Sequence, residues 1–195
     1  IQFKEQFKVG TDTDVIGVLR DCLSFLMSNI LKNTHSLIPN CSSITQNTSK
    51  TQIAYFTSFY TKLYYLFGEF SSAIEMGELH EKYSDYSISS INQVEGIFYY
   101  SLSLSAECLN TSITKLKMNF LKKLKKFETV LKRWATWAPE NFAGHYLLLK
   151  AEIYTIEGKI YQAIHVYHQA LEHCQRNENL TLGAITHERA AFFFL

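Results

Sequence analysis

The sequence predicts an all-α protein built from antiparallel helix hairpins that stack into a right-handed α-solenoid. One pattern occurs twice, 90 residues apart: Tyr64, Gly68 and Ala73, then Tyr154, Gly158 and Ala163. Self-similarity with a fixed period is typical of repeat architectures. The 195 residues include two prolines and eight glycines, too few for the many turns of an all-β protein. Apolar residues also recur at helical spacings of three and four.

The first 50 residues differ from the rest of the chain. Residues 15–31 carry one broad apolar stripe at helical spacing, with Thr13 or Asp14 available as an N-cap. Residues 33–50 are polar, contain Pro39 and lack a period, which indicates a loop. We therefore divide the chain into lead-in helices with a polar loop, residues 1–50, and a helical-repeat region, residues 51–195.

The repeat region begins with an aromatic-rich helix over residues 52–67, which Gly68 ends. Residues 69–83 form its antiparallel partner, and the Ser/Asp-rich residues 84–90 connect to a third helix over residues 92–109. Small residues in that third helix, among them Gly96 and Ser101, permit close helix approach. A fourth helix starts at Thr111 and ends near Pro139.

Residues 141–157 and 159–176 form a second hairpin, which turns at Gly158 and requires a positive φ there. Another helix starts at Leu180. The chain starts with a residue other than Met and stops on an aromatic run without a helix stop signal, so we expect a fragment of a larger polypeptide.

The second hairpin matches the tetratricopeptide pattern, in which small residues stand where paired helices cross and aromatic residues fill the gaps between pairs. The small positions are occupied by Ala151, Ala163 and Ala170, and the aromatic ones by Tyr154 and Tyr167. The first hairpin fits less well. Gly77 stands at its second aromatic position, and His80 at its third small position. The sequence therefore contains one good and one degenerate tetratricopeptide-like unit.

Several segments resemble the tetratricopeptide-like helical region of large sensor kinases. They include residues 64–73 (YYLFGEFSSA), 98–104 (FYYSLSL), 131–142 (LKRWATWAPENF), 145–152 (HYLLLKAE) and 188–192 (ERAAF). In that family a serine/threonine kinase domain, an ATPase, the helical region, a GAF sensor and a histidine kinase follow one another. The resemblance spans residues 52–195 and implies a noncatalytic region that mediates intramolecular relay or protein–protein interaction. A stand-alone adaptor or regulator arm that binds a protein or small effector is the alternative.

An enzyme function has almost no positive evidence in this sequence. Phosphate-binding glycine loops (GxxxxGK[ST], GxGxxG), kinase motifs (HRD, DFG) and hydrolase or metalloprotease motifs (GxSxG, HExxH) are all absent. We expect neither a catalytic residue nor a cofactor. His165, His168 and Glu172 have the spacing of a helical metal site, but we favour a solvated helix face for them, because alanines and Tyr167 define the buried side.

The fourth helix carries the strongest charge feature. Its candidate partner-binding residues are Lys115, Lys122, Lys123, Lys126 and Arg133. They suit an acidic partner, a membrane surface or nucleic acid, although an ordinary solvated face of a core helix is the favoured interpretation. The aromatic residues between Phe56 and Phe70 likewise suit a ligand groove, and core packing is favoured for them.

The totals favour a cytoplasmic protein, and the repeat architecture favours a protein partner. The net charge of +1 gives no case for nucleic acid. No signal peptide or 18-residue apolar run is present. Four Asn-x-Ser/Thr sequons suit a secreted protein, but such triplets are common by chance in a chain this rich in Asn, Ser and Thr. We read the four cysteines as core fillers in a reducing compartment. The sequence does not determine the oligomeric state.

Overall fold

A computed structural model describes residues 49–88 and 90–194, and all regular structure in these two ranges is helical. The elements are α4 (Lys50–Leu66), α5 (Phe70–Tyr83), the short 3₁₀ helix η1 (Ser84–Ser87), α6 (Ile91–Asn110), α7 (Thr114–Trp137), α8 (Pro139–Ile156), α9 (Ile160–Arg176) and α10 (Leu180–Phe194). The prediction of an all-α protein is confirmed for this part. The predicted lead-in helices and nearly all of the polar loop lie outside the described residues.

The predicted helix positions agree with the structure to within a few residues, and the start of the first one needs a correction. Lys50, assigned to the loop, is the first residue of α4. Ser49 caps this helix: the Gln52 amide donates to Ser49 Oγ at 3.3 Å, and the Ser49 amide donates to Gln52 Oε1 at 3.0 Å. This reciprocal capping box satisfies two amides that the first turn leaves without helical partners.

The two hairpins of the sequence repeat turn in the same way. Gly68 and Gly158 have φ angles of 76° and 71°, which confirms the positive φ expected at Gly158. In each turn the glycine amide donates a hydrogen bond to the carbonyl oxygen three residues earlier. The amide of the next residue donates one to the carbonyl oxygen five residues before it. The α9–α10 turn makes the same pair of bonds around Glu178, at φ 54°. This third turn has no glycine.

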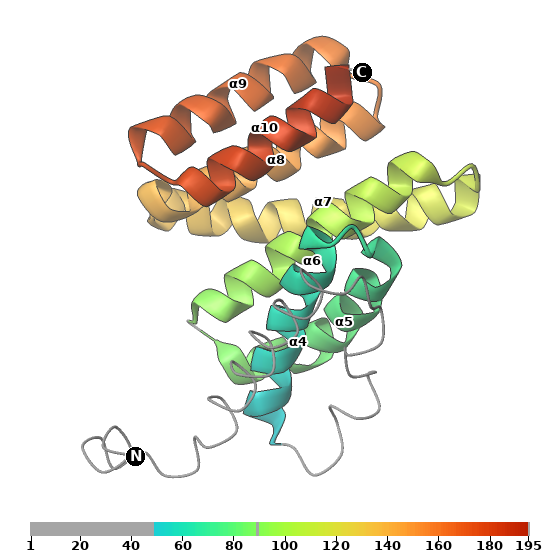
Figure 1. The fold of residues 1–195 in the computed structure, drawn as a ribbon, viewed down its shortest axis with the longest axis vertical. Coiled ribbons are helices and arrows are strands. Elements are labelled where there is room, and N and C mark those ends of the chain that lie inside the picture. The colour runs from blue at the N-terminus through green and yellow to red at the C-terminus, as the bar shows by residue number, and fades with distance from the viewer. Residues whose placement is uncertain (1–48, 89, 195) are drawn as a thin grey trace, which may run out of the picture.

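Each helix packs against its neighbours in a regular order. The alternate helices α4, α6, α8 and α10 contact one another in sequence, and α5, α7 and α9 each contact the alternate helices before and after them. Figure 1 shows α4 and α5 at one end of the long axis and α9 and α10 at the other. Helix α6 lies in the core, with Phe98, Tyr100, Leu102 and Leu104 at most 1% exposed.

Small residues permit the helices to approach closely where the pattern requires it. The alanines at the small positions of the repeat pattern are fully buried: Ala73, Ala151, Ala163 and Ala170. Cys108 and Cys174 are buried free thiols, as expected of core fillers. Tyr60 and Tyr65 are buried, and Phe56, Phe59, Tyr64 and Phe70 pack on the core. Core packing is therefore confirmed for the aromatic cluster except Phe67, which is 41% exposed.

The degenerate positions of the first hairpin have a physical explanation at the α5–α6 interface. A Cβ atom on Gly77 would lie 2.3 Å from the ring of Tyr100, and one on Gly96 would lie 2.3 Å from Nε2 of His80. Helix α5 therefore gives room to a tyrosine of α6, and α6 gives room to a histidine of α5. Tyr100 of α6 thus supplies the ring that the repeat pattern expects at Gly77, and Gly96 of α6 supplies the small residue that it expects at His80.

None of the helices in the described ranges combines the length and the apolar character required to cross a membrane.

Candidate functional site

Helix α7 has the amphipathic character that its sequence predicts. Leu124, Phe127 and Leu131 are buried. The five cations predicted as a partner surface do not share one environment. Lys123 is half-buried, whereas the other four are exposed: Lys115, Lys122, Lys126 and Arg133.

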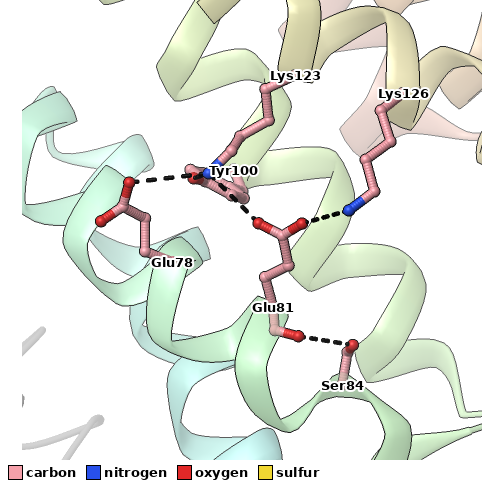
Figure 2. Close-up of polar contacts among 6 residues, drawn as sticks. All are labelled: Glu78, Glu81, Ser84, Tyr100, Lys123 and Lys126. Atoms are coloured by element: carbon pink, nitrogen blue, oxygen red, sulfur yellow. Dashed lines mark hydrogen bonds and ion pairs between the residues drawn. The ribbon is translucent and has the colours of Figure 1, made fainter. Parts of the chain in front are cut away.

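Two of these lysines are paired with carboxylates of α5 (Figure 2). Lys123 donates to the Tyr100 hydroxyl at 2.6 Å and lies 3.3 Å from Glu81 and 3.7 Å from Glu78. Lys126 bonds the other Glu81 oxygen at 2.7 Å. Burial disfavours the charged form of Glu81, but these two lysines outweigh it and hold its pKa below the usual value.

The remaining three cations of the set face solvent. Lys115 and Lys122 are exposed, and the Arg133 guanidinium lies 5.8 Å from the ring centre of Trp137. Trp137 itself is 76% exposed. The structure thus divides the predicted surface into two cations that help attach α7 to α5 and three that are available to a partner.

The candidate metal residues lie on the outer side of α9. His165, His168 and Glu172 are all exposed, as the favoured interpretation expects. Across the described part of the chain, no three His, Cys, Asp or Glu side chains are grouped so that they could hold a metal ion.

A groove of about 840 Å³ opens along the alternate helices. Residues of α4, α6, α8 and α10 and of the α9–α10 turn line it: Lys62, Ile91, Glu95, Phe98, Tyr99, Glu140, Asn141, Phe142, His145, residues 177–182 and Ile185. A cavity of this size falls in the range of small-ligand sites. This groove could not be predicted from the sequence, because its residues come from four helices.

The groove has a polar centre. Lys62 Nζ lies 2.6 Å from Glu95 Oε1 and 5.3 Å from the ring centre of Tyr99. Beside them His145 contacts Phe98 edge to face, with ring centres 4.7 Å apart. Burial lowers the pKa of His145 to about 4, so its imidazole is neutral at neutral pH.

A buried carboxylate ties four helices together outside the groove. Glu152 of α8 is fully buried and accepts hydrogen bonds from Arg189 of α10 at 2.6 and 2.9 Å and from the Tyr167 hydroxyl of α9 at 2.7 Å. Ser105 of α6 donates to the same carboxylate. Burial opposes its ionisation, but Arg189 and the hydroxyl donors hold the pKa of Glu152 below its usual value.

The chain matches no protein-family profile, no curated protein and no solved structure. The features of the described chain that bear on function are the groove, the exposed cations and the buried network.

Proposed function

We propose that the described helices form a tetratricopeptide-like right-handed solenoid that acts as a noncatalytic protein-binding region of a multidomain sensor kinase in the cytoplasm. The alternate helices α4, α6, α8 and α10 contact one another in chain order, and this arrangement supports the solenoid. The buried alanines and the matching turns at Gly68 and Gly158 support the repeat.

The groove is the single observation that carries this proposal. Its walls come from α4, α6, α8 and α10, so one bound segment would touch most of the stack at once. Stacked helix pairs generally present such extended concave surfaces to partners. The bound segment comes from another domain of the same polypeptide, which gives intramolecular relay, or from a separate signalling protein.

A peptide selection with a blocked groove tests this function. A random twelve-residue display library is selected on the immobilised chain and then on the Asn141→Trp variant, whose added ring occupies the groove mouth at an exposed position. We expect selected peptides to bind the parent and to lose binding to the variant, with circular dichroism and melting unchanged. If no peptide depends on the open groove, the groove is not a binding site.

The flanking sequence separates the kinase hypothesis from the stand-alone adaptor. A nucleotide-binding loop upstream and a GAF and histidine-kinase pattern downstream would support the kinase. Natural ends within a few tens of residues would support the adaptor.

The exposed cations of α7 are a second candidate surface, for an acidic partner. Their exposure, with Trp137 beside Arg133, favours it, because tryptophan and arginine are enriched at interface hot spots. A Lys115→Glu, Lys122→Glu, Arg133→Glu variant should lose capture of an acidic partner. Unchanged capture would exclude this surface.

A further inference from the structure

An internal lysine already occupies a cation subsite in the groove. The Lys62 ammonium sits between a carboxylate at 2.6 Å and an aromatic face at 5.3 Å. A carboxylate and an aromatic ring are the groups that bind an ammonium or guanidinium ion. The side chains of Lys62 and Glu95 are 29% and 31% exposed, so a cation from outside can reach Glu95 and compete with Lys62.

The other charges on the groove are negative. Glu140 and Glu178 line it and are exposed, and neither forms an ion pair with a described lysine or arginine. His145 contributes no charge at neutral pH. Three carboxylates thus face one ammonium, and a groove with this excess of negative charge concentrates cationic ligands.

The groove also offers apolar surface. Phe98, Tyr99, Leu182 and Ile185 form a floor that is at most 6% exposed. Two further apolar lining side chains remain open to water, Ile91 at 61% and Leu180 at 85% exposed. Exposed apolar residues bordered by charged ones are typical of interaction sites.

We infer that the groove selects a partner segment in which arginine or lysine stands beside apolar residues, with Lys62 as an internal competitor for the Glu95 subsite. This inference rests on the proposed function and adds the chemical class of the partner. The cations pair with Glu95, Glu140 and Glu178, and the apolar side chains cover Ile91 and Leu180. An acidic segment is disfavoured, since it would place like charges together in a partly desolvated site.

The composition of the selected peptides tests the inference. Groove-dependent peptides from the twelve-residue library should be enriched in arginine and lysine and depleted in aspartate and glutamate. For the tightest peptide, replacing each basic residue with glutamine should weaken binding about two- to fivefold per residue, in fluorescence anisotropy at low salt.

The Lys62→Met variant should change the affinity for the basic peptide in a direction that only this inference predicts. Methionine keeps the apolar stem and removes the competing ammonium, so the basic peptide should bind about two- to fivefold more tightly. A Glu140→Lys, Glu178→Lys variant should bind it at least about tenfold more weakly. A Glu75→Lys, Glu172→Lys variant, with two exposed changes outside the groove lining, alters the net charge by the same amount and should leave affinity within about twofold.

The outcomes distinguish the inference from the function on which it rests. Groove-dependent peptides without basic enrichment, or a Lys62→Met variant with unchanged or weaker binding, would overturn the inference and leave the binding function standing. Failure to recover any groove-dependent peptide would overturn both.

Discussion

The α5–α6 interface shows how single side chains set the distance between two helices. Tyr100 packs against Gly77, and the His80 ring packs against Gly96. His80 is 1% exposed, and its Nδ1 lies 3.0 Å from the carbonyl oxygen of Ala54. That contact makes Nδ1 the protonated nitrogen, and it extends the interface to α4. A methyl group at either glycine would therefore disturb three helices.

We expect Gly96→Ala to destabilise the protein. Its Cβ would lie 2.3 Å from the His80 ring, and overpacking of this kind costs on the order of 1–3 kcal/mol, which exceeds the gain of about 1 kcal/mol in helix propensity. Gly183→Ala is the matched control, because the nearest atom to its Cβ is 3.6 Å away. Urea unfolding should show Gly183→Ala as neutral or stabilising. Equal effects at the two positions would contradict this packing.

Buried histidines should make the protein sensitive to mild acid. Burial lowers the pKa values of both His80 and His145 from 6.5, that of His145 to about 4. The unfolded chain therefore binds more protons below pH 6.5, so the stability present above that pH is lost as pH falls towards the folded-state values. The carboxylates with lowered pKa values, Glu81, Glu152 and Glu157, lose their contribution only below about pH 4.5.

Melting from pH 7.5 to 5 checks this prediction. His145 alone should contribute up to about 2 kcal/mol across that window, less where water reaches its half-buried ring. A His145→Phe variant removes the titrating group and should flatten the pH profile. An unchanged slope would show that this histidine is not buried in its neutral form.

The backbone conformation of Glu178 lowers the stability of the protein at the edge of the groove. It adopts a left-handed conformation at φ 54° where the two matching turns have glycine. Glu178→Gly should raise the free energy of unfolding by about 0.5–1 kcal/mol, since the left-handed penalty for a side chain exceeds the extra entropy of glycine. The same variant should bind the basic peptide more weakly. Higher stability together with unchanged binding would remove Glu178 from the site.

At the scale of helices, the buried carboxylate of Glu152 in α8 holds α10 through Arg189. Arg189 is the cation that neutralises it, and it is itself 7% exposed. Removing one member of a buried pair leaves the other charge without compensation, whereas replacing both by apolar groups is often neutral. We therefore expect the pair to affect the position of α10 more than the stability of the protein.

Arg189→Met should cost about 3–5 kcal/mol in urea unfolding, because it leaves Glu152 buried and unpaired. The double variant Glu152→Met, Arg189→Met should recover most of that loss. Lys126→Met, in an ion pair whose lysine side chain is 65% exposed, controls for a surface pair and should cost at most about 1 kcal/mol. A double variant no more stable than Arg189→Met would show that the packing of arginine matters more than its charge.

The helices could be predicted from the sequence because apolar spacing and glycine turns are local signals. The positions of Ala151, Ala163 and Gly158 also predicted which residues lie at the crossings and the turn. The Ser49–Gln52 capping box is also a local signal, but it was not among the predicted features. Pairings such as Lys62 with Glu95 and Glu152 with Arg189 could not be predicted, because they depend on how separate helices align.

At the scale of the molecule, the groove connects the two ends of the described stack. Lys62 belongs to α4 at one end, and Leu182 and Ile185 belong to α10 at the other. The residues between them come from α6 and α8, whose buried side chains make one continuous core. A ligand that fills the groove therefore binds only when all four helices are in place, and it stabilises their arrangement by mass action.

Hydrogen exchange with the basic peptide should reveal this coupling between the ends. We expect bound peptide to slow amide exchange in both α4 and α10, because binding selects the state in which both are docked. In Arg189→Met, where α10 is loosened, affinity should fall and the slowing should shrink at both ends. Lys126→Met, which leaves the groove intact, should behave like the parent. Slowing confined to one end of the stack would show that the helices respond to a ligand separately, and the relay proposed for this region would lose its physical basis.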